Sequence, residues 1–214
     1  MQPIFITGIG TDAGKTVASA VVVQALRADY WKPVQAGLEE TDSDKIRSLT
    51  AVPGGVIHPE SYRLKLPASP HIAAREEGIR VSVSALVEKA GSILPANGKH
   101  LVIEGAGGLL VPLNERETVA DLIKALNAKL ILVSRNYLGS INHSLLTAEC
   151  CRSRNIPVLG WIFNDQYMSY EEEIAGWSGY PVLGNIPLLS GLNRENIAAQ
   201  AAVLAPQLTE ILRG

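Results

Sequence analysis

A glycine-rich segment near the N-terminus, Gly8–Thr16 (GIGTDAGKT), joins a short apolar run to a stretch of helical periodicity. Such a segment between a strand and a helix is the context that a phosphate-binding loop requires. Its glycines let backbone N–H groups approach phosphate oxygens, while the helix N-terminus and Lys15 add positive charge. The hydroxyl of Thr16 is a typical Mg²⁺ ligand. The segment therefore predicts a strand–loop–helix unit that binds the phosphates and Mg²⁺ of ATP.

The spacing of this loop departs from the usual pattern. Five residues separate Gly8 from Gly14, where the common phosphate loop has four. The extra residue argues against an ordinary GTPase or kinase loop. The alternative, a glycine-rich turn with a surface lysine, is disfavoured by the strand and helix that flank the segment.

Short apolar runs alternate with helical patterns along the rest of the chain. Strands are predicted at Ile4–Thr7, Tyr30–Val34, Leu101–Glu104, Leu130–Ser134, Val158–Asn164 and Pro181–Ile186. Helices are predicted at Lys15–Ala28, Val81–Ile93, Val119–Leu126, Ser140–Arg154 and Asn196–Leu212. Continuous apolar runs are typical of strands covered on both faces, and the alternation implies right-handed parallel crossovers. We therefore predict a three-layer α/β fold of the P-loop NTPase type, with a mostly parallel central sheet, in one domain over residues 1–214.

The bulk composition narrows the range of partners. The 214 residues carry a formal charge of −2, so nucleic acid and anionic membranes are not expected as partners. No run of 18 apolar residues occurs, and the first apolar stretch leads into the glycine loop, so it is interpreted as structure and not as a signal. The adjacent Cys150 and Cys151 do not suit a framework disulfide. These features favour a cytoplasmic protein with small ligands.

Four further blocks follow the loop in order: Lys32–Gly37 (KPVQAG), Glu104–Gly108 (EGAGG), Gly139–His143 (GSINH) and the pair at 164–165 (ND). Together with the extended loop, they resemble the dethiobiotin synthetase family, the ATP-dependent ligases of biotin synthesis. The likeness runs from the first strand to beyond Ile186. A single block is a weak signal, but five in register are specific.

The resemblance implies an activity. The family converts 7,8-diaminononanoate (7,8-diaminopelargonate), CO₂ and ATP into dethiobiotin, ADP and phosphate. One amine captures CO₂ as a carbamate, ATP phosphorylates the carbamate to a mixed anhydride, and the second amine closes the ring. Positioning and charge neutralisation are expected to carry such phosphoryl transfer.

The resemblance also implies which residues meet the nucleotide. Lys32 and Lys15 are expected to flank the γ-phosphate as catalytic residues, although a lysine at a strand end can also simply face water. Mg²⁺ is assigned to Thr16, Asp44 and Glu104, with an ordinary helix-start role as the alternative for Asp44. Nucleotide contacts are expected from Asp12, Ala13, Gly14, Lys15, Thr16, Val17, Glu104, Gly105, Ala106 and Gly107.

The adenosine site is expected farther along the chain. Asn164 resembles the residue that hydrogen-bonds the adenine edge, because one amide both donates and accepts. Asp165 is grouped with it, and the base pocket is assigned to Pro187, Leu188 and Leu189. Glu195 is assigned to the ribose, with a solvated carboxylate at a helix start as the alternative.

Substrate contacts are assigned by the same resemblance. Gly139, Ser140, Ile141 and Asn142 begin a predicted helix whose free N–H groups suit a carboxylate, against the alternative of a plain helix cap. In the family the partner subunit lends this cradle, which implies a homodimer with active sites at the interface. Thr11 and Ala36 are also assigned to substrate. At position 36 the family usually has Ser or Thr, so a hydroxyl is missing here. Asp12 faces either a substrate amine or its own backbone.

Two other functions share this loop type. An amidating synthetase of the cobyrinic-acid type normally adds a glutaminase domain with a nucleophilic Cys and a His, and none fits here. A ParA/MinD-like positioning ATPase carries an additional lysine early in the loop, whereas Gly8 to Ala13 contains none. Both remain alternatives to the ligase.

Overall fold

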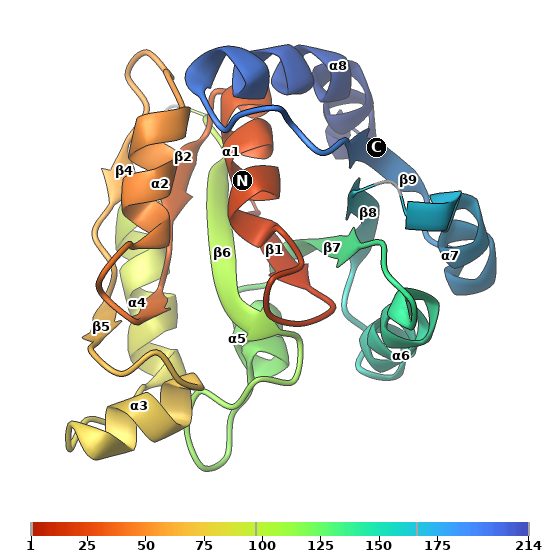
Figure 1. Ribbon diagram of the computed structural model, residues 1–214. Coiled ribbons are helices and arrows are strands. Elements are labelled where there is room, and N and C mark those ends of the chain that lie inside the picture. The colour runs from red at the N-terminus through yellow and green to blue at the C-terminus, as the bar shows by residue number, and fades with distance from the viewer. Residues whose placement is uncertain (1, 97, 166, 214) are drawn as a thin grey trace.

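A parallel β-sheet forms the centre of the computed structural model, which describes residues 2–96, 98–165 and 167–213. Its seven strands lie in the order β4-β2-β6-β1-β7-β8-β9, and neighbouring strands run parallel (Figure 1). The strands are β1 (Ile4–Gly8), β2 (Asp29–Trp31), β4 (Ile57–His58), β6 (Leu101–Gly108), β7 (Lys129–Arg135), β8 (Val158–Asn164) and β9 (Val182–Ile186). The parallel sheet with helices on both faces confirms the predicted fold class.

Helices cover both faces of this sheet (Figure 1). One face packs against α1 (Lys15–Leu26), α2 (Asp42–Leu49) and α8 (Arg194–Arg213), with α1 and α8 side by side. The other packs against α3 (Pro70–Glu76), α4 (Val83–Ile93), α5 (Val119–Ala125), α6 (Ser140–Ser153) and α7 (Glu171–Ser178). A short 3₁₀ helix, η1 (Tyr167–Ser169), precedes α7.

Alternation within the strands explains the continuous apolar runs. In β1 the ring of Phe5 joins the core on one face, whereas Ile4 and Ile6 join the core on the other. In the same way, Leu132 and Ile131 of β7 belong to opposite cores. Because successive side chains point to opposite faces, a strand buried on both faces needs apolar residues at every position.

One predicted strand proved to be two. The run Tyr30–Val34 divides at Lys32 and Pro33 into β2 and β3 (Val34–Ala36). Strand β3 leaves the main sheet and pairs with β5 (Tyr62–Leu64) in a separate two-stranded parallel sheet. Proline has no N–H for the ladder, so the pairing changes at this point.

Several short elements were not predicted, and one strand is longer than expected. Helices α2 and α7 and strands β3, β4 and β5 are all eight residues or shorter, too short for a clear periodic pattern. The strand predicted to end at Glu104 continues as β6 through the glycine run to Gly108. Glu104 therefore lies inside a strand, beside Ile6 of β1.

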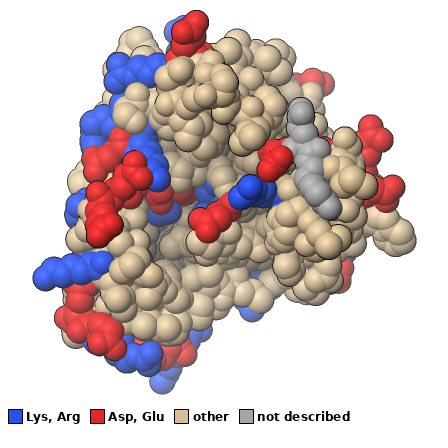
Figure 2. All heavy atoms as spheres, in the orientation of Figure 1, with Lys and Arg blue, Asp and Glu red and all other residues tan. Residues whose placement is uncertain are grey.

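The structure can be compared with what the charge, the cysteines and the hydropathy of the sequence predict. Figure 2 shows basic and acidic side chains intermixed on one face, gathered on the side of α2 and α3. Cys150 and Cys151 are both free, as predicted. No helix in the described part of the chain has the length and hydropathy of a membrane span.

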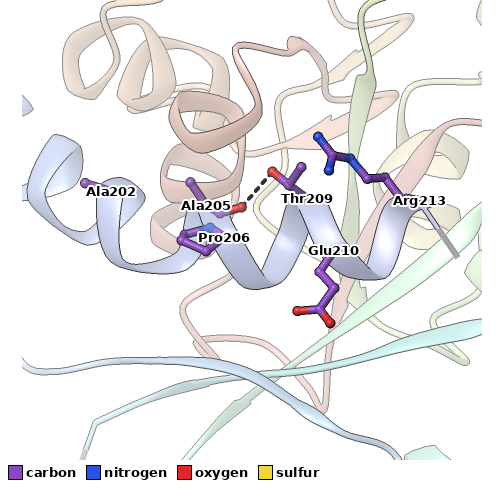
Figure 3. A pocket seen from close by; sticks show the side chains of 6 residues that line it. All are labelled: Ala202, Ala205, Pro206, Thr209, Glu210 and Arg213. Carbon is purple, nitrogen blue, oxygen red and sulfur yellow. Dashed lines mark hydrogen bonds between the residues drawn. The ribbon is translucent and has the colours of Figure 1, made fainter.

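A hollow of about 490 Å³ lies along the outer side of α8 (Figure 3). Its lining comes from that helix alone: Ala202, Ala205, Pro206, Thr209, Glu210 and Arg213. Pro206 has no N–H to donate back along the helix, and the Thr209 hydroxyl donates to the Ala205 carbonyl at 2.7 Å. None of the residues assigned to nucleotide or substrate from the sequence lines this hollow.

Candidate functional site

A larger cavity of about 910 Å³ opens at the carboxyl end of the sheet. The phosphate loop after β1, the junction of β2 and β3, the start of α2 and the end of β6 all contribute to its lining. Loops at the carboxyl ends of parallel strands are where such folds bind ligands. Thr11, Asp12, Lys15, Thr16, Lys32, Ala36, Asp42 and Glu104 are among its lining residues.

The phosphate loop is held in shape by its own backbone. Gly14 has φ +84°, a left-handed conformation that glycine adopts without strain, and it caps α1. The ammonium of Lys15 donates to the Gly10 carbonyl at 3.0 Å, so the side chain folds back over the loop. Burial lowers the pKa of Lys15, and the nearby charge of Lys32 lowers it further. A lysine in this position gains strongly from an anion that arrives beside it.

Four charged or polar side chains meet next to the loop. The Thr16 hydroxyl lies 2.9 Å from Asp42 Oδ1 and 3.0 Å from Glu104 Oε1, so its single proton can serve either carboxylate. Lys32 Nζ lies 2.6 Å from Asp42 Oδ2 and 3.2 Å from Glu104 Oε1, and it also donates to the Gly105 carbonyl at 3.0 Å. Lys32 thus bridges two carboxylates beside Thr16.

The charges in this cluster stabilise one another. Burial by itself would lower the pKa of Lys32, but the charges of Glu104 and Asp42 and their hydrogen bonds outweigh it and raise that pKa. For Asp42, burial acts to raise the pKa, and the charge of Lys32 with the bonds from Lys32 and Thr16 outweighs it and lowers the pKa. Lys32 and Asp42 are therefore both held in their ionised forms.

The prediction that Asp44 lies at this cluster is corrected by the structure. Its side chain is 64% exposed and pairs with Arg47 Nη1 at 2.6 Å. Its backbone N–H and its carboxylate are both hydrogen-bonded to Thr41, the N-cap of α2. Asp44 is thus a capping partner, and Asp42, at the first position of the helix, takes the place beside Thr16.

The missing hydroxyl at Ala36 is not replaced by its neighbour Gln35. The Gln35 side-chain amide donates to the Ala36 and Gly37 carbonyls at 3.2 and 3.0 Å, so both of its N–H groups are used. Its oxygen accepts from the Asp42 backbone N–H at 3.2 Å. Gln35 therefore ties the loop after β3 to the start of α2 and places Asp42.

Asn164 lies against the phosphate loop. Its amide Nδ2 donates to the Ala13 carbonyl at 2.7 Å, a contact across the end of β8. Asp165 follows with φ +69° and pairs with Arg135 at 3.4 Å. Of the residues assigned to the base pocket, Pro187 and Leu189 are partly buried, whereas Leu188 is 85% exposed. Glu195 is exposed in the first turn of α8.

The segment assigned to the substrate carboxylate begins α6. Gly139 caps this helix with φ +106°, and the Ser140 hydroxyl accepts from the Tyr137 N–H at 3.3 Å. Ser140 is buried, Ile141 is partly buried and Asn142 is exposed. Within the described residues of this chain, none of the four lines the large cavity, whereas Thr11 and Ala36 do.

Three residues of the site were missed at the level of sequence: Asp42, Tyr30 and Gln35. Asp42 carried a signal, since the run Asp-Ser-Asp was recognised as a helix start, but the wrong aspartate was chosen. Tyr30 reads as an apolar strand residue, and Gln35 as a loop residue. Their roles depend on contacts with Glu104 and Asp42 that are formed only in the folded chain.

The oxygens gathered here fit a magnesium ion. Among the described residues, no three His, Cys, Asp or Glu side chains group as a metal centre, so the protein oxygens are two carboxylates and one hydroxyl. Mg²⁺ in nucleotide sites is usually bound by one or two carboxylates, with phosphates and water completing the ligands. Thr16, Asp42 and Glu104 match that donor set.

Comparison with known proteins agrees with this geometry. A family model described as an AAA domain matches residues 2–196. The protein of Cytophaga hutchinsonii named ATP-dependent dethiobiotin synthetase BioD is 49% identical over 205 residues, 95% of this chain and 97% of that protein. The one of Christiangramia forsetii with the same name is 48% identical over 184 residues, 85% of this chain and 86% of that protein.

Solved structures show the fold at a greater distance. The MinC:MinD cell division protein complex of Aquifex aeolicus matches with a TM-score of 0.61 at 13% identity, covering 100% of this chain and 95% of that chain. Identity at that level shows a shared fold only, whereas the relatives at nearly half identity cover almost the whole chain. Together with the extended loop and the lysine-bridged carboxylates, they establish that this chain belongs to the dethiobiotin synthetase family.

Proposed function

We propose that this chain, as a single domain, closes a cyclic urea on 7,8-diaminononanoate with CO₂ and ATP, giving dethiobiotin, ADP and phosphate. The observation that carries the proposal is the position of Lys32, buried between Asp42 and Glu104 in the same cavity as Lys15 and Thr16. Two ammonium groups beside a phosphate loop suit a reaction in which negative charge moves between oxygens. Both relatives carry the name ATP-dependent dethiobiotin synthetase, which supports the same reaction.

In this proposal the phosphate loop binds the ATP phosphates through its backbone N–H groups. Thr16, Asp42 and Glu104 hold Mg²⁺, which neutralises phosphate charge when it is bound. Lys15 lies folded on the Gly10 carbonyl in the structure and turns toward the phosphates. Lys32 moves from its carboxylate partners toward the transferring phosphoryl group and the carbamate oxygen, where its charge stabilises the transition state.

Asn164, Pro187, Leu188 and Leu189 are proposed to hold the adenine, with Asp165 nearby and Glu195 at the ribose. The position of Asn164 supports this, because its amide already contacts the phosphate loop and would link the base to the phosphates. Its Oδ1 is an acceptor suited to the adenine amino group.

The substrate carboxylate is proposed to bind at Gly139–Asn142 of a partner subunit in a homodimer. This segment lies outside the cavity of its own chain. It forms the N-terminus of α6, and the free N–H groups of a helix N-terminus favour anions. Leu138, just before it, is 81% exposed, as expected for a residue covered in a dimer. Sedimentation equilibrium tests the dimer. A cytoplasmic location stays a prediction from the cysteines and the composition.

A coupled ADP-release assay with 7,8-diaminononanoate and bicarbonate tests the reaction. We expect ADP release to require the diamine, because the phosphoryl acceptor is the carbamate formed on it. Omission of bicarbonate and omission of the diamine are the controls. ADP release that proceeds equally without the diamine would reject the ligase and favour a positioning ATPase, whose fold this chain shares.

The pair Asp42→Asn and Asp44→Asn tests the metal ligands. We expect Asp42→Asn to raise the Mg²⁺ concentration for half-maximal activity about 10-fold or more, because a neutral amide is a poorer ligand for Mg²⁺ than a carboxylate. Asp44→Asn is the matched control, since its side chain is exposed and pairs with Arg47. It should leave that concentration within about twofold, with only a small loss of helix capping. A reversed pattern would return the assignment to Asp44.

A further inference from the structure

Tyr30 is a buried tyrosine whose hydroxyl reaches the functional site. It lies in β2 with no exposed surface, and its Oη donates to Glu104 Oε2 at 3.0 Å. Strands β2 and β6 are neighbours, with Tyr30 opposite Val102, so the side chain extends along the sheet toward Glu104. Neither the phosphate loop nor the blocks quoted from the sequence include this residue.

The two oxygens of Glu104 have different partners. Oε2 is held by Tyr30, whereas Oε1 lies 3.0 Å from the Thr16 hydroxyl and 3.2 Å from Lys32 Nζ. The terminal torsion of a glutamate is broad, so the carboxylate plane is not fixed by its own chain. A donor that holds one oxygen from the apolar side fixes that plane and directs the other oxygen at Thr16.

The surroundings of Tyr30 make it a steady donor. A carboxylate oxygen has no proton to give, so the phenol hydroxyl is the donor and Glu104 Oε2 the acceptor in this buried hydrogen bond. The ring packs in the same apolar core as Ile4, Ile6 and Val102, and this packing limits its movement. A phenol held in this way differs from Lys32, whose ammonium has other acceptors at Asp42 and Gly105.

We propose that Tyr30 is a positioning residue for the metal site: by holding Glu104 Oε2, it presents Oε1 to Mg²⁺ as a ligand from one oxygen. The inference rests on one part of the proposed function, which is that Mg²⁺ binds together with the nucleotide. Donors behind a metal ligand commonly change metal affinity by about 10-fold to 100-fold when they are removed. Tyr30 has that relation to Glu104.

A purely structural role would give a different result. A buried tyrosine usually finds some acceptor for its hydroxyl, and loss of that bond alone would lower the stability of the fold and leave the metal dependence of nucleotide binding unchanged. The test must therefore measure metal coupling at equilibrium, apart from both stability and turnover.

The experiment is calorimetric titration of the full chain with ADP, with and without Mg²⁺, for wild type and Tyr30→Phe. We expect the affinity for ADP without metal to stay within about twofold, and the gain in affinity from Mg²⁺ to fall about 10-fold or more. The matched control is Tyr62→Phe, which removes another tyrosine hydroxyl, one that accepts from the Ser82 N–H outside the cavity lining. Its gain from Mg²⁺ should equal that of wild type.

Two outcomes overturn the proposal: an unchanged gain from Mg²⁺ in Tyr30→Phe, or an equal loss of ADP affinity with and without metal. If thermal unfolding shows that Tyr30→Phe is partly unfolded at 25 °C, the titrations of all three proteins are made at 10 °C, where the same outcomes apply. No diamine is present in the titration. A chain that fails the ADP-release assay but shows the Tyr30 effect would reject the reaction and leave this assignment standing.

Discussion

Lys32→Ala is expected to lower kcat about 100-fold to 1000-fold, the usual loss when a charge-stabilising donor is removed from a transition state. Lys32 is 4% exposed and lies between two carboxylates beside the phosphate loop, so water cannot replace its charge. The measurement is kcat at saturating ATP and diamine. Near-normal turnover would remove Lys32 from the mechanism.

The same substitution is expected to destabilise the chain without nucleotide. It leaves Asp42 and Glu104 facing each other without their cation, and breaking a buried pair commonly costs about 3–5 kcal/mol. Asp42 is 23% exposed, so water reduces that cost. We expect Mg²⁺ to recover part of the lost stability, because it replaces the cation between the carboxylates. Thermal unfolding with and without Mg²⁺ measures this.

Lys45→Ala is the matched control for both measurements. Lys45 lines the same cavity but pairs with Glu40 at the surface, where both side chains are well exposed. Exposed pairs of this kind contribute about 0–1 kcal/mol. Turnover and stability should therefore stay near those of wild type. A loss equal to that of Lys32→Ala would mean that the general charge of the cavity, and not the position of Lys32, is what matters.

Gly14→Ala is expected to weaken ADP binding about 100-fold. Position 14 has φ +84°, where a side chain costs about 1–2 kcal/mol, and its Cβ would lie 2.8 Å from Asn164 Cγ. Asn164 is held by its bond to the Ala13 carbonyl, so relief of the contact breaks that bond and shifts the loop N–H groups. The free loop relieves both the strain and the contact by leaving its binding shape, and ADP binding must restore that shape at a cost of about 2–3 kcal/mol, which corresponds to that change in affinity. Calorimetric titration with ADP measures it.

Gly78→Ala separates backbone strain from the contact with Asn164. Gly78 follows α3 with φ +65°, and a Cβ there meets nothing within 4 Å. It should lower the unfolding temperature through strain and leave ADP affinity unchanged. If Gly14→Ala binds ADP as well as Gly78→Ala does, the contact between Gly14 and Asn164 does not hold the loop in its binding shape.

Much of the fold could be predicted because its signals are local. The apolar runs of β1, β7 and β8 each lie within a single segment. The helix after the loop was predicted to start at Lys15, as it does, and ends at Leu26, two residues before the predicted end. Arg27 follows in a left-handed conformation with φ +49°, and its N–H caps the Val23 carbonyl. The helix propensities of the residues do not determine the position at which such a helix ends.

The choice between Asp42 and Asp44 is a case in which the prediction from neighbouring residues was wrong. Both lie in one polar run, and both suit a helix start. Thr41 engages Asp44 as the third helical residue, which leaves Asp42 at the first position. The sequence contains the pattern Thr41-x-x-Asp44, which is typical of a helix cap and assigns Asp44 to that role. The resemblance to the family instead led to the assignment of Asp44 to the metal site.

The sequence by itself determined the phosphate loop, the class of fold and the family, because glycines, strand runs and motif blocks act over a few neighbouring residues. The tertiary structure alone decided how the site is assembled. Thr16 meets Glu104 across 88 positions, and Tyr30 meets it across 74. The sheet order β2-β6-β1 brings these residues together, and strand order depends on packing between distant segments. Tyr30 therefore reads as a core residue in the sequence and becomes a partner of Glu104 only in the folded sheet.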